Sequence, residues 1–181
     1  MENKNGNVVH SSVWSNIFNT PTEKSDLEKS LQAIPMFKEL SKKDLSLVSK
    51  LINNRSYIAG EYIFSQGDPG LGLYIIRNGE VTIKKFTSEN EGLLLATLFK
   101  GDFFGELALI DGEKRSASAI AKTDTKIAVI FKPDLDEFIE KYPQKGVKIL
   151  KGVLQIITYR LRKMDDDFLS IKEQQKNNIG E

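Results

Sequence analysis

Closely spaced glycines divide residues 59–83 into hydrophobic runs that are too short to form helices. The runs end at turn signals such as Asp68-Pro69-Gly70 and Asn78-Gly79. They are Tyr62–Phe64, Leu73–Ile76 and Val81–Ile83, and further runs follow at Leu93–Phe99, Ala117–Ala121 and Ile127–Phe131. Many short strands joined by regular turns predict a β-sandwich or a β-barrel.

Residues 103–121, FFGELALIDGEKRSASAIA, bring a glycine, a carboxylate and an arginine into one loop. Gly105 lets the backbone approach a ligand because it has no Cβ. The apolar residues after Glu106 can form one or two helical turns, whose first N–H groups attract an anion. Arg115 adds a permanent charge and a planar fork of donors that matches phosphate oxygens. Glu106 would repel phosphate but can accept a hydrogen bond from a sugar hydroxyl. The loop therefore predicts a nucleotide whose phosphate folds back on its own ribose.

The same loop resembles the phosphate-binding cassette of the cyclic nucleotide-binding domain family, of the type found in catabolite activator protein and in kinase A regulatory subunits. The family pattern is roughly F-G-E-[LI]-A-L, a short linker, then R-[AST]-A-[ST]. This chain reads FGELAL at 104–109 and RSAS at 115–118. The resemblance implies an α+β fold, with an eight-stranded antiparallel, jelly-roll-like β-roll, N-terminal helices, a short helix after the barrel and a long C-terminal helix.

The resemblance also implies a role for each matching residue. Glu106 would bind the ribose 2′-hydroxyl and Arg115 the cyclic phosphate, while nearby amides and side chains take the remaining phosphate oxygens. The expected ligand-binding residues are Phe104, Gly105, Glu106, Leu107, Ala108, Arg115, Ser116 and Ala117. Lys114 departs from the family, because kinase regulatory subunits usually carry proline there. The alternative for Glu106 and Arg115 is a salt bridge to each other or to surface partners, which would contribute little energy.

Helix signals flank the predicted strands. A capping box at Ser25–Glu28 predicts a helix through Ala33, and Ser41 predicts the cap of a second helix over residues 42–51. The sequence Ile34-Pro35-Met36-Phe37 between them is typical of the family's helical lead-in. After the barrel, Pro133 predicts the start of a third helix that ends near Lys141, and a fourth is expected from about residue 144 to 175.

Apolar residues of the long fourth helix recur in alternating steps of three and four, at Val147, Leu150, Leu154, Ile157, Leu161, Met164, Phe168 and Ile171. We refer to these eight residues as the heptad seam. The seam either folds onto the β-roll of the same chain or pairs with a second copy, and its regularity favours a parallel homodimer. Gly152 lies off the seam and is expected to weaken the helix locally.

Base-contacting residues in the family usually follow an R-L pair on this helix, which here is Arg160-Leu161. The resemblance therefore makes Arg162, Met164 and Asp165 the candidates for contact with the base. Asp165 could accept from an adenine amino group, or it could be a solvated member of the acidic run 165–167.

Composition argues against several other classes of function. The 26 basic and 25 acidic side chains give a net charge of +1, so we expect neither a nucleic-acid surface nor a membrane patch. The chain has no cysteine, and His10 is its only histidine, which argues against thiol catalysis, a Ser-His-Asp triad and a histidine metal cluster. We predict a cytoplasmic protein without a metal that is not an enzyme. A phosphodiesterase, the enzymatic alternative, would need such a metal cluster.

The chain is expected to comprise a flexible tail (1–24), a cyclic nucleotide-binding domain (25–142), a lid and dimerisation helix (143–176) and a disordered tail (177–181). In the first tail, docking of Trp14 on the domain is favoured over a role as a partner-binding handle.

The predicted function is a cyclic nucleotide sensor, for cAMP rather than cGMP, although Ser116 permits both. We expect a homodimer that acts through an unknown protein effector. No helix-turn-helix follows the long helix before Glu181, so a stand-alone module without a DNA-binding domain is expected. The alternative is a ligand-free β-roll scaffold for protein–protein interaction.

Overall fold

Two four-stranded antiparallel sheets, ordered β1-β8-β3-β6 and β2-β7-β4-β5, form the predicted β-roll. They belong to a computed structural model that describes residues 21–88, 90–107 and 112–179. The strands are β1 (Ile52–Tyr57), β2 (Tyr62–Phe64), β3 (Gly72–Asn78), β4 (Val81–Thr87), β5 (Asn90–Leu98), β6 (Phe103–Phe104), β7 (Ser118–Ala121) and β8 (Thr125–Phe131).

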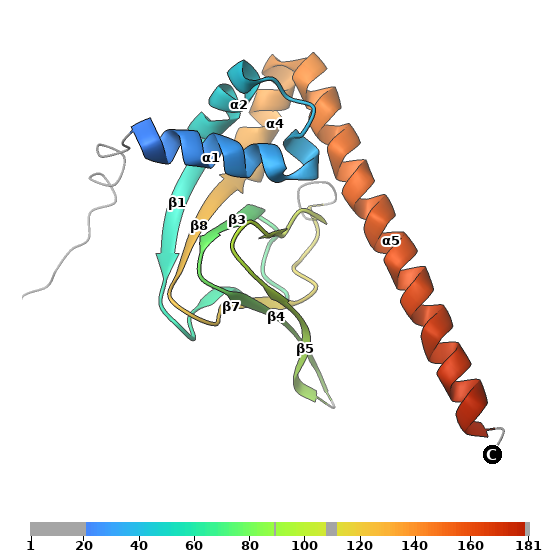
Figure 1. Cartoon of the computed structure of the whole chain (residues 1–181). Helices are drawn as coiled ribbons and strands as arrows, with labels where there is room; N and C mark the ends of the chain where they lie inside the picture. The colour runs from blue at the N-terminus through green and yellow to red at the C-terminus, as the bar shows by residue number, and fades with distance from the viewer. Residues whose placement is uncertain (1–20, 89, 108–111, 180–181) are drawn as a thin grey trace, which may run out of the picture.

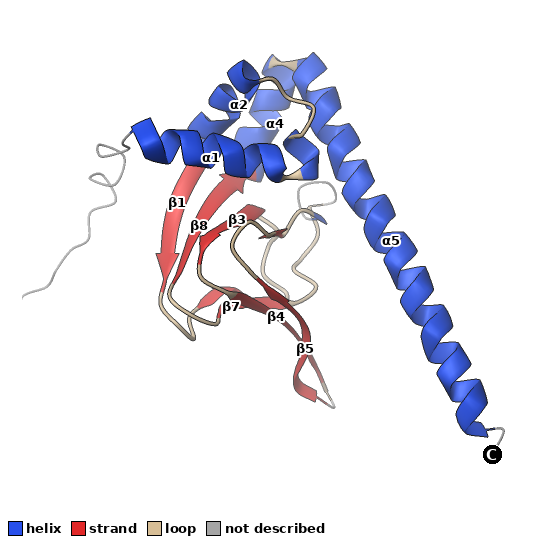
Figure 2. Cartoon of the chain, in the orientation of Figure 1, coloured by secondary structure: helices blue, strands red, loops and turns tan. Residues whose placement is uncertain are grey.

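Helices precede and follow the roll, which confirms the predicted α+β architecture. They are α1 (Pro21–Ala33), α2 (Lys42–Val48), α4 (Lys132–Lys141) and α5 (Pro143–Ile179), with short 3₁₀ helices η1 (Pro35–Phe37) and η2 (Ser49–Leu51). Figures 1 and 2 show α1, α2 and α4 gathered at one end of the sheets, with α5 leaving from that end as a long rod. Among the described residues, none of the helices combines the length and the apolar character that crossing a membrane requires.

Strands β3 and β8 form the centre of the first sheet and are buried on both faces. Leu73 and Ile75 of β3 pack against the helices, while the alternating residues Tyr74 and Ile76 point into the roll. Strand β8 does the same, with Ala128 and Ile130 toward the helices and Ile127 and Val129 inside. Because successive side chains of a strand point to opposite faces, a strand covered on both sides needs a continuous apolar run. These runs are the ones that the sequence pattern identified.

Strands β1 and β6 were missed by the sequence pattern. The second helix was predicted over residues 42–51, a range that α2 and the 3₁₀ helix η2 together occupy, and β1 begins directly afterwards at Ile52. Strand β1 is polar, and three of its six residues are exposed, so it lacks the apolar signature of a strand. It pairs with β8 along its whole length, from Ile52 opposite Ile130 to Tyr57 opposite Thr125. Backbone pairing with a strand more than sixty residues away fixes its conformation.

The capping prediction at Ser41 is confirmed, and the one at Ser25 is wrong. Ser41 Oγ accepts from the Asp44 backbone N–H at 3.2 Å, and the Asp44 carboxylate accepts from the Ser41 N–H at 3.3 Å. Helix α1 instead begins at Pro21, so Ser25 lies inside it; proline is favoured in the first turn because its missing N–H needs no partner there.

Asp44 also connects α2 to the first turn of α5. Its carboxylate lies 3.0 Å from Lys145 Nζ. The hydrogen bond from Lys145, with a smaller contribution from Ser41, lowers the pKa of Asp44 below its usual value. The ion pair therefore helps to fix where α5 starts relative to the helical end of the roll.

Helix α5 packs on the rest of the chain through a face that differs from the heptad seam. Its buried apolar residues are Ile149, Val153 and Ile156, which join the core beneath α1, η1 and α4. The seam residues Val147, Leu150, Leu154, Leu161, Met164 and Phe168 are all exposed, and Ile157 is partly buried. The side chain of Ile171 lies outside the description. The seam is thus turned away from the β-roll of its own chain.

Gly152 has a structural role that the sequence did not reveal. It is buried where α5 crosses η1, and a Cβ there would lie 2.2 Å from Met36 Cα and 2.7 Å from the Pro35 carbonyl oxygen. Both are backbone atoms that cannot move aside without displacing η1. The helix therefore accepts a glycine because only glycine permits this approach.

We predict that Gly152→Ala destabilises the protein, although alanine normally stabilises a helix relative to glycine by about 1 kcal/mol. The overlap with Met36 should reverse that sign and lower the free energy of unfolding by about 1–3 kcal/mol, as overpacked cores do. Denaturant unfolding measures the difference. Lys151→Ala, at the exposed neighbouring position, is the control and should be close to neutral; a stabilised Gly152→Ala would contradict the packing.

Candidate functional site

The loop between β6 and β7 carries the candidate site, and Gly105 begins it. Gly105 has φ of +80°, in the left-handed region that other residues rarely adopt. A Cβ there would lie 2.8 Å from Arg115 Nη1 and 2.8 Å from the Gly72 carbonyl oxygen. Glycine thus allows the chain to turn out of β6 while remaining in contact with the arginine.

Arg115 is buried, with 6% of its surface exposed, and its guanidinium joins separate parts of the backbone. Its Nη2 donates to the Gly72 carbonyl at 3.0 Å and its Nη1 donates to the Gly105 carbonyl at 3.2 Å. The guanidinium also stacks over the Phe64 ring, 4.2 Å from its centroid. A buried cation of this kind is costly unless its donors are satisfied.

The main chain of Arg115 is held as firmly as its side chain. Its N–H donates to the Asp68 carbonyl at 2.8 Å, and its own carbonyl accepts from the Gly67 N–H at 2.8 Å. The turn that precedes β3 therefore fixes the position of the arginine. The Nε of Arg115 is buried and has no hydrogen-bond partner within the described part of the chain. The Nε N–H therefore remains available to an acceptor from outside the described residues.

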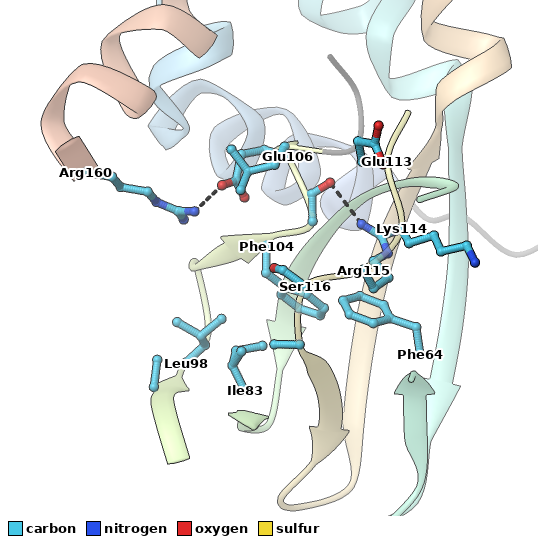
Figure 3. A pocket seen from close by; sticks show the side chains of 14 residues that line it. Phe64, Ile83, Leu98, Phe104, Glu106, Glu113, Lys114, Arg115, Ser116 and Arg160 are labelled. Carbon is cyan, nitrogen blue, oxygen red and sulfur yellow. Dashed lines mark hydrogen bonds and ion pairs between the residues drawn. The ribbon is translucent and has the colours of Figure 1, made fainter. Parts of the chain in front are cut away.

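Glu106 is also buried, with 1% of its surface exposed, and its partner comes from the long helix. The Glu106 Oε1 atom accepts from Arg160 Nη1, and the two side chains point toward each other across the pocket in Figure 3. The alternative of a salt bridge to a surface partner thus holds for Glu106, because Arg160 is about half exposed, whereas no ion pair joins Glu106 to Arg115 among the described residues. The carboxylate and the Arg115 guanidinium are instead separate features of one pocket.

The pocket has a volume of about 470 Å³, which falls in the range that small-molecule ligands occupy. One side is polar and is formed by the loop and Arg160, and the other is an apolar wall from the roll. Its lining residues are Phe64, Ile83, Ala96, Leu98, Phe104, Gly105, Glu106, Leu107, Glu113, Lys114, Arg115, Ser116, Ala117 and Arg160. A bound molecule would thus meet charge at one end and hydrocarbon at the other.

Most predicted loop residues lie together around this pocket. Phe104, Gly105, Glu106, Leu107, Arg115, Ser116 and Ala117 all line it, and Ala108 lies outside the described residues. Lys114, the departure from the family pattern, is at the rim, and its backbone bridges to Pro69. The loop thus keeps a fixed approach to Arg115 without a proline.

The three base-contact candidates are not brought to the pocket. Arg162, Met164 and Asp165 are all exposed and none lines it, whereas Arg160 of the same helix does. At 100° per residue, Arg162 and Asp165 point well away from the direction of Arg160, and Met164 lies one turn further along. The R-L pair had marked this stretch of helix, but only the orientation of α5 shows which side chain faces the pocket.

The residues present fit a ligand that carries an anion and a sugar. The Arg115 guanidinium, whose Nε has no partner among the described residues, suits a phosphate, and a buried carboxylate suits a hydroxyl donor. The apolar wall suits a planar, weakly polar ring. In the described ranges, no group of three or more His, Cys, Asp or Glu side chains is placed to hold a metal ion.

Comparison with known proteins identifies sequence relatives of this chain. The family model described as the cyclic nucleotide-binding domain matches residues 54–142. The chain is 32% identical over 145 residues to the cyclic AMP receptor protein of Thermus thermophilus, covering 79% of this chain and 65% of that protein. It is 35% identical over 105 residues to a cAMP-dependent protein kinase regulatory subunit of Hypocrea atroviridis, covering 58% of this chain and 22% of that protein.

A solved structure extends the comparison to the fold. A cyclic nucleotide-binding domain from Methylobacillus flagellatus aligns with a TM-score of 0.71 and 26% identity, covering 85% of this chain and 93% of that one. The chain therefore spans nearly the whole of that solved domain, but under two thirds of the receptor protein and about a fifth of the kinase subunit.

Proposed function

We propose that this chain, which belongs to the cyclic nucleotide-binding domain family through residues 54–142, is a cyclic nucleotide sensor. The observation that carries the proposal is that two buried charged groups line one pocket: the Arg115 guanidinium, whose Nε has no partner among the described residues, and the Glu106 carboxylate. A buried charged group is costly unless its polar atoms are satisfied. A ligand phosphate would give the Arg115 Nε an acceptor, and a ribose hydroxyl would be a second donor to the Glu106 carboxylate beside Arg160.

In this proposal Arg115 binds the cyclic phosphate and Glu106 the ribose 2′-hydroxyl. Ser116, Ala117 and the amides near Leu107 and Ala108 take the remaining phosphate oxygens, and Ile83, Ala96 and Leu98 cover the base. The ligand is cAMP rather than cGMP, because two relatives are a cyclic AMP receptor protein and a cAMP-dependent kinase regulatory subunit. One of these relatives is named a receptor and the other a regulatory subunit, which supports the proposal of a regulatory module without catalytic activity.

Transmission of the signal would run through Arg160. From Thr158 onward every α5 side chain whose burial is described is exposed, and Arg160 is the one that lines the pocket. Its bond to Glu106 therefore ties the distal part of α5 to the loop that holds the ligand. A ligand that shares the Glu106 carboxylate changes the strength of this tie, and α4 and α5 reposition as a consequence. Such coupling is a difference in ligand affinity between two states of the helix.

The heptad seam supports a homodimer as the state in which the sensor acts. Six of its large apolar side chains are exposed on α5, in a pattern that matches coiled-coil pairing. The seam equally supports the second candidate function, a scaffold that pairs with other proteins without a ligand. The effector that receives the signal, the four-segment organisation and the cytoplasmic location stay predictions from the sequence.

We expect Arg115→Ala to weaken cAMP binding by about 30- to 1000-fold, or about 2–4 kcal/mol, because a desolvated charge-assisted contact is lost. Isothermal titration with cAMP and cGMP measures the change. Because Arg115 also holds the Gly72 and Gly105 carbonyls, Glu106→Gln is measured as a second variant that preserves side-chain shape, and each variant's thermal unfolding is recorded. Arg162→Ala is the control that removes an exposed arginine. Wild-type protein that binds neither nucleotide would favour the scaffold.

Arg160→Ala should uncouple α5 from the ligand. In the wild type, cAMP is expected to slow amide hydrogen exchange around residues 157–161, because Glu106 has two oxygens and can accept from Arg160 and from ribose together. The variant should lose this response and bind cAMP several-fold more weakly, since coupling is reciprocal. Arg162→Ala, two positions along the same helix, should behave as the wild type. Equal behaviour of the two variants would remove Arg160 from the mechanism.

A charge in the seam should dissociate the dimer. We expect Leu154→Glu and Leu161→Glu to sediment as monomers at concentrations where the wild type is dimeric, since the buried carboxylates repel each other across the pair. Tyr159→Glu places the same charge on an exposed position of α5 between them, off the seam, and should remain dimeric. Sedimentation equilibrium gives the masses; a monomeric wild type would contradict the dimer.

A further inference from the structure

A second hollow lies at the helical end of the molecule and shares no lining residue with the candidate ligand site. Leu47 of α2 and Leu51 of η2 form one wall, and Phe138 and Tyr142 at the end of α4 form the other. The two rings are packed together, with centroids 5.1 Å apart. Leu47, Leu51 and Tyr142 are only partly buried. We call this hollow the α2–α4 groove.

The size and rim of the groove argue for protein side chains as its occupants. Its volume is about 260 Å³, below the range of most small-molecule sites. Its rim carries both signs of charge, Lys50 and Lys141 together with Asp134 and Glu137. A mixed rim around an apolar floor offers no preference for an ion of either sign, but it suits a neutral apolar segment.

We propose that residues 13–18 of this same chain, Val-Trp-Ser-Asn-Ile-Phe, dock in the α2–α4 groove. Their apolar side chains are Val13, Trp14, Ile17 and Phe18, and spacings of three and four place such residues on one face of a helical turn. The stretch from Ser11 to Asn19 contains no charged residue, so it meets neither repulsion nor unpaired charge at the rim. Its two aromatic rings match the aromatic wall formed by Phe138 and Tyr142.

The segment is tethered close to the groove. It precedes α1, which begins at Pro21 and packs against α2 and η2, the elements that form one wall. Seven residue steps separate Trp14 from Pro21, and an extended chain covers about 24 Å over that length. Because the segment is covalently attached, its local concentration at the groove is high and modest contacts suffice to hold it there.

The chemistry of the rim also accommodates the indole of Trp14. An indole N–H can only donate a hydrogen bond, so a docked tryptophan requires an acceptor at the edge of its site. The carboxylates of Asp134 and Glu137 lie on the α4 side of the groove and provide such acceptors. Docking would hold α4, the helix that leads into α5, against α2.

Trp14 is the only tryptophan of the chain and reports its own environment. In the full-length protein we expect blue-shifted emission and several-fold less acrylamide quenching than in the urea-unfolded chain. Leu47→Glu should shift the emission to that of the unfolded chain. The control Leu94→Glu adds the same charge at an exposed leucine of β5 and should leave the emission unchanged.

A second pair of variants leaves the groove untouched, so a destabilised core cannot explain the result. Ile17→Asp should release Trp14, whereas Asn16→Asp, one position away, should keep it docked. The proposal is overturned if wild-type Trp14 already quenches as in the unfolded chain. It is also overturned if Leu47→Glu and Leu94→Glu behave alike, or if the blue shift disappears on dilution, which would assign the groove to a segment of a second copy.

Discussion

The buried guanidinium of Arg115 is the interaction on which the rest of the site depends. It binds the carbonyls of Gly72 and Gly105, lies over the Phe64 ring and is fixed through its own backbone by the turn at Gly67 and Asp68. It thereby joins the start of β3, the end of β6 and the loop before β7. A side chain so constrained cannot rotate to meet a ligand, so the pocket is largely preformed. The same contacts explain why Gly105 must be glycine, since any Cβ would displace the guanidinium.

The sequence predicted those structural features that are determined by residues close together in the chain. The runs of β3 and β8 are continuous because both faces are covered, and the cassette residues are neighbours in the chain, so their convergence needs only one loop. The cap at Ser41 is likewise a matter of four adjacent residues, although the equally local helix start predicted at Ser25 is wrong, because α1 begins at Pro21. Where the cause is distant, prediction failed. Polar β1 is a strand because it pairs with β8, and Arg160 faces the pocket because of the direction in which α5 leaves the roll.

Helix α5 has two apolar faces, and the more regular of them in the sequence is not the one that packs on the rest of the chain. Its seam of large apolar residues dominates the sequence, yet the helix packs on its own chain through Ile149, Val153 and Ile156, with Gly152 allowing contact with η1. A short internal face over the first half leaves six of the seam residues exposed, while Ile157 is partly buried. The internal face makes the contacts within the chain, and a glycine that weakens an isolated helix is what lets this helix approach the core.

The pairing of Glu106 with Arg160 makes the ligand loop and the helix parts of one electrostatic unit. A carboxylate that is 1% exposed is costly to bury without a partner, whereas an arginine that is about half exposed can rehydrate at little cost. Loss of the ion pair is therefore more costly for Glu106, which stays buried, than for Arg160, which is accessible to water. In the proposed sensor, a ribose hydroxyl at the second carboxylate oxygen would join Arg160 rather than replace it. The shared carboxylate, rather than any movement of the rigid roll, would then be the point at which ligand binding acts on α5.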